Sequence, residues 1–211
     1  MDTIENLIII ILGSSKVGKT SIIHRYFKNE YNSENISTIG IDHNNRFFKF
    51  GESKIRIDYI DTAGQEAFRA IAANYLKKAD GVILVFDITQ RDTFELVDRW
   101  IEELEKNNNI NNIGKILLGN KIDLEDERKI KDEEGHNLAK TLNCNYMGVS
   151  AKTGENVKEA LDEIAKLTYE KYISSPRAKA SNSFSIKREE KKVKFNIKKK
   201  GSKAAKCCQD I

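Results

Sequence analysis

Runs of apolar residues alternate with segments of helical spacing along most of this chain. Three runs are rich in branched aliphatic residues, as expected of strands buried on both faces of a sheet: Ile4–Leu12, Val82–Ile88 and Lys115–Gly119. Two further runs, Phe47–Phe50 and Lys54–Ile60, alternate apolar and polar residues around a glycine-containing pair. We expect these two runs to pair as a hairpin.

Helical spacing follows several of these strands. A helix is expected after the first strand, through about Arg25, and three more segments have amphipathic spacing: Phe94–Leu104, Glu134–Leu142 and Val157–Tyr172. This order predicts an α/β fold in which a mostly parallel sheet carries one antiparallel edge. Ligands bind such sheets at the carboxyl ends of the strands, so chemically active residues are expected in the loops there.

The pattern stops after Ser174, where Ser, Lys, Arg and Asn dominate. We therefore predict a folded domain over residues 1–173 and a flexible tail over residues 174–211. The composition, 39% hydrophobic and 32% charged, is that of a soluble globular protein. The run Leu7–Leu12 is too short to span a bilayer, and nothing marks it as a secretory signal, which predicts a chain that stays in the cytosol.

Charge is unevenly distributed between these two parts. Twelve Lys or Arg residues stand against two Glu residues between Arg177 and Lys206, although the net charge of the chain is only +4. The body is therefore acidic and the tail basic. This pattern indicates an interaction tail and argues against a nucleic-acid-binding domain, so no nucleic-acid partner is expected. Cys144, alone in an apolar stretch, is interpreted as a buried, inert thiol.

The strongest motif lies between the first strand and the first helix. Residues 13–20 match the phosphate-loop pattern G-x-x-x-x-G-K-[ST] in full, and glycines there let backbone N–H groups face an anion. In order, the residues are Gly13, Ser14, Ser15, Lys16, Val17, Gly18, Lys19 and Thr20, with Ser21 next in the helix. Lys19 is expected to reach the β- and γ-phosphates and the Thr20 hydroxyl to bind Mg²⁺. The motif indicates a nucleoside triphosphate, but a kinase or an ATPase would share it.

A second pair of motifs indicates the base. Asn120-Lys121-Ile122-Asp123 follows a predicted strand, and Ser150-Ala151-Lys152 comes later in the chain. Asp123 can accept hydrogen bonds from the ring N–H and the exocyclic amine of guanine, and leaving it unpaired against adenine would be costly. Asn120 and the Ala151 N–H would also contact the base, and Lys121 and Lys152 would cover its plane. Guanine is therefore favoured, which argues against an ATPase or a kinase.

The segment Asp61-Thr62-Ala63-Gly64-Gln65-Glu66 carries residues suited to hydrolysis. Asp61 can hold Mg²⁺ through water, the Gly64 N–H can approach the γ-phosphate, and the Gln65 amide can orient an attacking water. Thr38, in the loop after the first helix, could add a hydroxyl to Mg²⁺ while the γ-phosphate is present. The predicted metal ligands are therefore Thr20, Thr38 and Asp61, and the predicted catalytic residues are Lys19, Thr38, Gly64 and Gln65.

Together these motifs resemble the Ras superfamily of small GTPases and, within it, the Rab family. The resemblance covers about Leu7–Tyr172 and the extreme C-terminus, and Rab character rests on residues 39–42, 84–89 and 119–126 and on the paired cysteines. It implies a six-stranded sheet with helices on both faces, and a monomer that binds GTP and GDP with Mg²⁺ and hydrolyses GTP slowly. Leu124 joins the nucleotide-binding set, and Tyr31 lies where the family has an aromatic on the guanine face; the less favoured alternative for Tyr31 is a surface tyrosine.

The chain ends with adjacent cysteines that fit a Rab tail better than a farnesylation box. The resemblance implies a geranylgeranyl chain on both Cys207 and Cys208, and two lipids plus a basic tail would anchor the protein stably. It also implies a switch in vesicle traffic that cycles between the cytosol and the cytoplasmic face of endomembranes or the plasma membrane. The implied partners are effectors, an exchange factor, a GTPase-activating protein, a GDP dissociation inhibitor and the Rab prenylation machinery.

Two alternatives remain at this point. One is a Ras- or Rho-like signalling GTPase, against which the paired cysteines argue, and the other is a GTP-binding module with negligible hydrolysis, against which Gln65 argues. Departures from the Rab pattern weaken the assignment of any particular effector. His43 stands where most Rabs have Phe, Ile60 where they have Trp, and Leu76 and Lys77 where they have Tyr and Arg. Two of these positions belong to the aromatic surface that reads the nucleotide state.

Overall fold

The computed structural model describes residues 5–32, 41–62, 75–107 and 110–178 of the chain. Internal contacts divide the chain into two units, Met1–Lys171 and Tyr172–Ile211, and the sheet belongs to the first unit. In the described residues, no helix is both long enough and apolar enough to cross a membrane.

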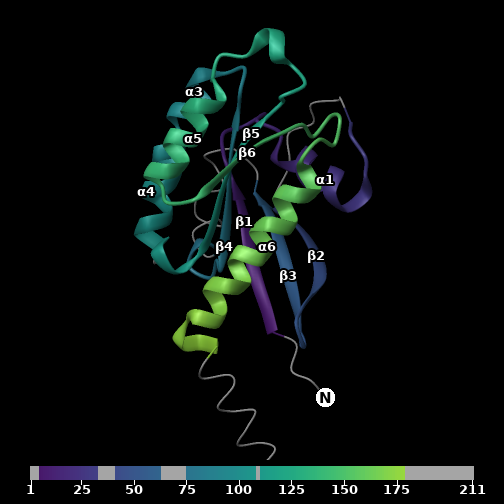
Figure 1. Cartoon of the computed structure of the whole chain (residues 1–211), viewed down its shortest axis with the longest axis vertical. Coiled ribbons are helices and arrows are strands. Elements are labelled where there is room, and N and C mark those ends of the chain that lie inside the picture. Colours follow the sequence, from purple (N-terminus) through teal and green to yellow (C-terminus); the bar gives the residue numbers. More distant parts are fainter. Residues whose placement is uncertain (1–4, 33–40, 63–74, 108–109, 179–211) are drawn as a thin grey trace, which may run out of the picture. The chain divides into compact units, whose positions relative to one another are not determined.

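Six strands form one sheet in the order β2-β3-β1-β4-β5-β6 (Figure 1). β2 and β3 pair antiparallel as a hairpin, and every other neighbouring pair is parallel. The strands are β1 (Glu5–Leu12), β2 (Ile41–Phe50), β3 (Ser53–Thr62), β4 (Gly81–Asp87), β5 (Gly114–Asn120) and β6 (Asn145–Val149). The predicted α/β fold, with a mostly parallel six-stranded sheet and one antiparallel edge strand, is confirmed.

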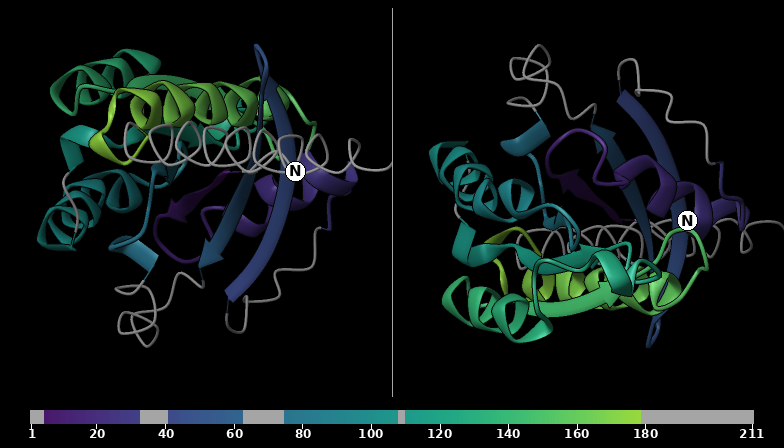
Figure 2. Two further views of the ribbon diagram at one scale, coloured as in Figure 1. Left: turned by 90° about the horizontal axis from the view of Figure 1, so that it is seen from below. Right: turned by 90° about the horizontal axis from the view of Figure 1, so that it is seen from above.

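Helices cover both faces of this sheet. They are α1 (Lys19–Lys28), α3 (Arg91–Glu95), α4 (Val97–Asn107), α5 (Asp132–Thr141) and α6 (Val157–Ser174), with short 3₁₀ helices η2 (Ile110–Asn112) and η3 (Glu125–Glu127). On one face, sheet residues such as Ile10 and Leu84 share a buried cluster with Ile101 of α4 and Ala139 of α5. On the other face, where α1 and α6 lie (Figures 1 and 2), the Tyr59 hydroxyl donates to the carbonyl oxygen of Leu161 at 3.1 Å.

Several element boundaries differ from the sequence-based expectation. β2 begins at Ile41, well before the predicted start at Phe47. Its first half pairs with β3 through the backbone, but it carries exposed polar residues such as His43, so it shows no apolar alternation. The first helix ends at Lys28 rather than Arg25, and Asn29 caps it in the left-handed conformation. β6 had no predicted counterpart in the apolar pattern, since only its last residue, Val149, is fully buried.

The predicted helix Phe94–Leu104 is in fact two helices, α3 and α4, which meet at Leu96. The backbone N–H of Leu96 bonds to the carbonyl oxygen of Asp92 at 3.1 Å, but the carbonyl oxygen of Leu96 accepts only a long bond, 3.4 Å, from the N–H of Trp100. The break is therefore a loosened turn, which an apolar spacing pattern does not register. Cys144, interpreted from the sequence as a buried thiol, is only partly buried, although its desolvation raises its pKa to about 11.

Candidate functional site

The predicted motifs that the structure describes lie at the carboxyl ends of the parallel strands. Residues 13–20 follow β1, Asp61 lies near the end of β3, Asn120 ends β5, and residues 150–152 follow β6. Because β1, β3, β4, β5 and β6 run parallel, these ends meet at one edge of the sheet (Figure 1). This edge is where an open α/β sheet binds its ligand.

The loop between β1 and α1 packs so closely that two of its positions require glycine. A Cβ atom at Gly13 would lie 2.3 Å from the carbonyl oxygen of Val85. Gly18 has a φ of 97°, and a Cβ atom there would lie 2.3 Å from Nδ2 of Asn120. Lys16 also has a positive φ, 65°, although it is not a glycine, and its side chain is exposed. A left-handed conformation costs a non-glycine residue roughly 1–2 kcal/mol, so the loop holds Lys16 in a strained backbone state.

Lys19 is the buried cation of this loop. Its side chain is 5% exposed, and its Nζ donates to the carbonyl oxygens of Gly13 at 2.9 Å and Ser14 at 2.8 Å. Desolvation lowers the pKa of Lys19 to about 8, and the nearby Asp61 carboxylate only partly offsets that effect. The hydroxyl of Ser14 is buried in the same loop and has no hydrogen-bond partner among the described residues.

Asp61 and Thr20 meet beside this lysine. The Thr20 hydroxyl donates to Oδ2 of Asp61 at 2.5 Å, while the buried Oδ1 of Asp61 has no hydrogen-bond partner among the described residues. Burial raises the pKa of Asp61, and its hydrogen bond from Thr20 and the charge of Lys19 act in the opposite direction. A hydroxyl and a carboxylate with an unsatisfied oxygen are the hard oxygen donors that Mg²⁺ prefers, so this pair fits the predicted metal.

Asn120 connects the phosphate loop to the second predicted base motif. Its Nδ2 donates to the carbonyl oxygen of Val17 at 2.7 Å, and its Oδ1 accepts the backbone N–H of Ala151 at 3.2 Å. The Asn120 side chain is 1% exposed. One buried amide therefore holds two of the predicted nucleotide-contacting segments together.

Asp123 and the residues around it form the rest of the predicted base site. The Ser150 hydroxyl donates to Oδ1 of Asp123 at 2.6 Å, and Nζ of Lys152 lies 3.7 Å from Oδ2. Leu124 closes the turn after this motif, with its backbone N–H bonded to the carbonyl oxygen of Lys121 at 2.9 Å. The carboxylate of Asp123 is thus contacted on both of its oxygens by residues of the loop after β6.

Two residues that sequence reasoning missed also support the site. Asp87, at the end of β4, is fully buried and forms an ion pair with Lys121. A carboxylate at the carboxyl end of an otherwise apolar strand was a usable signal for Asp87. Arg25 of α1 donates to the carbonyl oxygens of Ala151 and Lys152. Arg25 and Ala151 are 126 residues apart, and no local sequence pattern predicts a contact over that separation.

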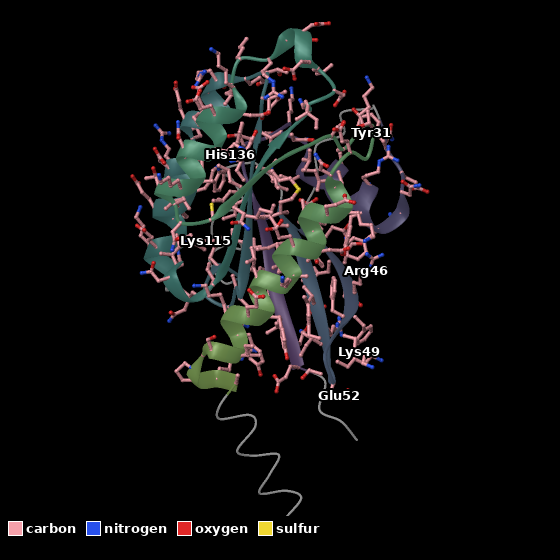
Figure 3. All side chains as sticks on the ribbon, viewed as in Figure 1. Tyr31, Arg46, Lys49, Glu52, Lys115 and His136 are labelled. Carbon is pink, nitrogen blue, oxygen red and sulfur yellow. The ribbon has the colours of Figure 1, made fainter. Side chains whose placement is uncertain are left out.

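Some predicted residues lie outside the described residues, namely Thr38, Gly64, Gln65, Cys207 and Cys208. Tyr31 lies just beyond the end of α1 (Figure 3), and its side chain is 41% exposed. Ser15 is exposed, Val17 is buried, and Ser21 lies partly buried in the first turn of α1.

The departures from the Rab pattern can be located on and beside the sheet. His43 of β2 is paired with Ile60 of β3 across the hairpin. The exposed His43 ring also meets Tyr75, whose hydroxyl lies 3.2 Å from His43 Nε2, whereas Ile60 is 2% exposed. Leu76 is buried and Lys77 is exposed. At these positions the chain therefore has an exposed contact between His43 and Tyr75, and a buried isoleucine, Ile60.

Comparison with known proteins identifies the family of this chain. The family model described as "Ras family" matches residues 8–170. The chain is 36% identical over 203 residues to the Ras-related protein RABA5c of Arabidopsis thaliana, covering 95% of this chain and 92% of that one. It is 38% identical to the Ras-related protein Rab-1 of Theileria annulata over 80% of this chain and 76% of that one. It is also 38% identical to the Ras-related protein Rab-13 of Rattus norvegicus over 75% of this chain and 77% of that one.

The matched residues 8–170 include the phosphate loop, the base motifs and all six strands after the first residues of β1. A family match of that extent, with relatives above one-third identity along most of both chains, settles the family. This chain belongs to the Rab family of small GTPases, which bind GTP and GDP and hydrolyse GTP.

Proposed function

We propose that the loops at the carboxyl ends of β1, β3, β5 and β6 form a single Mg²⁺-dependent site for GTP and GDP. The observation that carries this assignment is the burial of Lys19 and Asp61 at that edge, with Ser14 Oγ and Asp61 Oδ1 lacking partners among the described residues. Buried charges and unsatisfied polar atoms are costly unless a ligand compensates them. Phosphate oxygens and a divalent cation would compensate all of them.

The phosphates would lie in the loop of residues 13–20, with Ser21 next to it. Lys19 would exchange its bonds to the Gly13 and Ser14 carbonyl oxygens for bonds to the β- and γ-phosphates. Thr20 and Asp61 would hold Mg²⁺, and Thr38 would join them while the γ-phosphate is present. When bound, Mg²⁺ would neutralise part of the charge on the β- and γ-phosphates.

The guanine base would lie between the segments of residues 120–124 and 150–152. Asp123 would accept from the base, and its two partners Ser150 and Lys152 support that role because they fix the carboxylate before any nucleotide arrives. Asn120 and the backbone of Ala151 would contact the guanine edge, and the stems of Lys121 and Lys152 would cover its plane. Tyr31 would cover the base from the other side.

Hydrolysis would depend on Gln65 and Gly64, with Lys19 and Thr38 stabilising charge on the γ-phosphate. Small GTPases of this design are slow alone, at about 10⁻⁴ s⁻¹, and an arginine from an activating protein accelerates them by about 10⁵-fold. Release of the γ-phosphate would free the segments around Thr38 and Gln65, so that effectors read a timed signal. An exchange factor, a GTPase-activating protein and a GDP dissociation inhibitor are the regulators that such a cycle needs.

We place the boundary of the GTPase domain at residue 173 and assign residues 174–211 to membrane attachment. Two geranylgeranyl chains, on Cys207 and Cys208, would give stable anchoring where one chain gives only reversible binding. Each lysine of the tail would add about 1 kcal/mol of attraction near anionic lipid. The protein would then cycle between the cytosol and the cytoplasmic face of endomembranes or the plasma membrane, acting in vesicle traffic.

The nucleotide assignment is tested by single-turnover hydrolysis of [γ-³²P]GTP by the purified full chain with Mg²⁺. We expect slow phosphate release that excess ATP does not inhibit, loss of release in Gln65→Leu, and weakened Mg²⁺ and GTP binding in Thr20→Asn. Gln209→Leu is the matched control and should release phosphate at the wild-type rate. Competition by ATP would refute guanine selection, and GTP binding without release would leave a binding module instead of a switch.

The tail assignment is tested in eukaryotic cells by fractionation and intact-mass measurement. The wild-type chain should carry two prenyl adducts in the membrane fraction. Single Cys207→Ser or Cys208→Ser variants should carry one adduct and attach weakly, and the double variant should remain in the cytosol. An unmodified wild-type chain in the membrane fraction would contradict lipid anchoring.

A further inference from the structure

We propose that Arg25 is a positioning residue for the base-contacting loop of residues 150–152, and that it sets how long the nucleotide stays bound. The inference rests on the proposed guanine site, because it assigns a role toward that site to a residue outside all of its motifs. Arg25 lies in the last turn of α1, the helix that follows the phosphate loop.

The Arg25 guanidinium joins two backbone segments that are distant in sequence. Nε donates to the carbonyl oxygen of Ala151 at 2.9 Å, and Nη2 donates to that of Lys152 at 2.6 Å. On the other side, Nη1 donates to the carbonyl oxygen of Asn29 at 3.0 Å and to its Oδ1 at 3.2 Å. The end of α1 and the base loop are therefore held to each other through one side chain.

This arrangement requires arginine in particular. A guanidinium carries its five N–H donors on three nitrogens in a fixed plane, so it can bond the base loop on one side and Asn29 on the other. The three donors of a lysine ammonium share a single nitrogen, which cannot reach both sides at once. The loop also lies alongside the stem of Arg25, at ordinary van der Waals distance. Gly154 has a φ of 90°, and a Cβ atom there would lie 3.4 Å from Cδ of Arg25.

Both backbone polar groups of Ala151 are held by side chains, one of which is Arg25. The backbone N–H of Ala151 is bonded to Asn120 Oδ1, and its carbonyl oxygen is bonded to Nε of Arg25. Asn120 in turn bonds to Val17 in the phosphate loop, which leads back into α1. The contacts form a closed circuit from the phosphate loop through α1 and Arg25 to the base loop, and back through Asn120.

A loop held in its binding geometry loses less freedom when the ligand arrives, and most such affinity differences appear in the dissociation rate. Loss of Arg25 would free the carbonyl oxygens of Ala151 and Lys152, so the base loop would keep its bond to Asn120 but lose its attachment to α1. The hydrogen bonds of Arg25 within the described residues go to Asn29 and to the base loop, and none of them goes to Lys19, Thr20 or Asp61. Nucleotide release should therefore change while hydrolysis of bound GTP does not.

The test uses the full chain loaded with fluorescent GDP, and follows its release after excess unlabelled GDP is added at saturating Mg²⁺. Arg25→Lys keeps the charge but loses the fork, and Arg25→Met keeps only the stem. The matched control is Arg91→Lys, because Arg91 also bonds a backbone carbonyl oxygen, that of Lys129 at 2.6 Å, and a carboxylate, that of Glu134. Single-turnover hydrolysis of bound GTP is measured on the same samples.

We expect release to be roughly tenfold faster in Arg25→Lys, the effect of losing about one net hydrogen bond, and faster still in Arg25→Met. Hydrolysis should stay at the wild-type rate in both, and Arg91→Lys should match wild type in release. Unchanged release from Arg25→Lys and Arg25→Met would overturn the proposal, as would an equal acceleration in Arg91→Lys or a parallel loss of hydrolysis.

Failure of both Arg25 variants to fold would also overturn it, because Arg25 would then be a requirement of the fold itself. The underlying site assignment fails separately. If the wild-type chain does not retain labelled GDP, the proposed guanine site is wrong. If it retains GDP and the Arg25 variants release it at the wild-type rate, only the role of Arg25 is wrong.

Discussion

The ammonium group of Lys121 lies 2.5 Å from Oδ2 of Asp87, and this carboxylate is fully buried at the end of β4. Asp87 also accepts the backbone N–H of Thr89 at 2.9 Å and its hydroxyl at 2.8 Å. The lysine of the guanine motif is therefore anchored to the neighbouring strand. Lys121 has a φ of 73°, so the ion pair also holds a residue in a left-handed conformation.

Replacing Asp87 by Asn should lower the stability of the GDP-loaded protein by about 1.5–3 kcal/mol, because it removes the charge from several hydrogen bonds. It should also speed GDP release, because Lys121 loses its anchor. Urea unfolding and fluorescent-nucleotide release measure the two effects. Asp98→Asn, on the exposed face of α4, is the control and should shift stability by no more than about 0.5 kcal/mol. Equal losses in the two variants would show that the ion pair contributes nothing.

Nucleotide binding should depend on pH through Lys19, whose pKa is lowered to about 8 by desolvation. Phosphate oxygens favour the protonated amine, so binding raises the pKa above that value. Below about pH 8 the lysine is already charged and binding takes up no proton. Above it, binding requires protonation, and the affinity for GDP should fall as the pH rises.

Titration calorimetry at saturating Mg²⁺, in buffers of different ionisation enthalpy, measures this proton uptake. We expect almost none at about pH 7 and a rise toward about one proton between pH 8 and 9. Proton uptake that is the same at about pH 7 and about pH 9 would mean that Lys19 is charged at both values. That result would contradict the lowering of its pKa by burial.

Helix α6 passes so close to the sheet at Thr168 that two strands carry glycine there. A Cβ atom at Gly81 would lie 2.2 Å from Thr168 Oγ1, and one at Gly114 would lie 2.7 Å from the Thr168 backbone nitrogen. Each Gly→Ala change should therefore cost about 1–3 kcal/mol through overpacking. Thr168→Ala should largely rescue Gly81→Ala but not Gly114→Ala, because only the first clash is with a side chain alone.

Double-mutant cycles by urea unfolding separate these two cases. Thr168→Ala by itself should cost only about 1 kcal/mol, because it removes one buried methyl group while the buried hydroxyl has no hydrogen-bond partner among the described residues. Equal rescue of both alanine variants would contradict the geometry of the crossing.

Ile60, at the position where most Rabs have tryptophan, is buried in this chain. Ile60 is 2% exposed within the buried cluster, so Ile60→Trp should destabilise the fold by about 1–3 kcal/mol. Ile60→Val is the control and should cost about 0.5–1.5 kcal/mol. Thermal unfolding of the GDP-bound variants tests this, and a tryptophan variant as stable as wild type would mean that the position can open to the surface.

Features that are local in sequence could be predicted, and features that join distant segments could not. The loop around Lys19 and the motif beginning at Asn120 were found because their chemistry depends on short, ordered runs next to apolar strands. The edge strand β2 was underestimated because backbone pairing, not apolar alternation, holds its polar half. Arg25 was missed because its role arises only when the fold brings α1 to the base loop. Asp87 did carry a sequence signal, a carboxylate at the end of an apolar strand, but its partner Lys121 is identified only by the fold.

The side chain of Asn120 has one end on the phosphate loop and the other on the base loop. Rotating this amide to follow either loop would break its bond to the other. Intermediates in which the base is free and the phosphates are still held, or the reverse, should therefore be short-lived, and nucleotide loss should approach an all-or-none event. Displacing either one of the two loops should therefore be enough to empty the whole site.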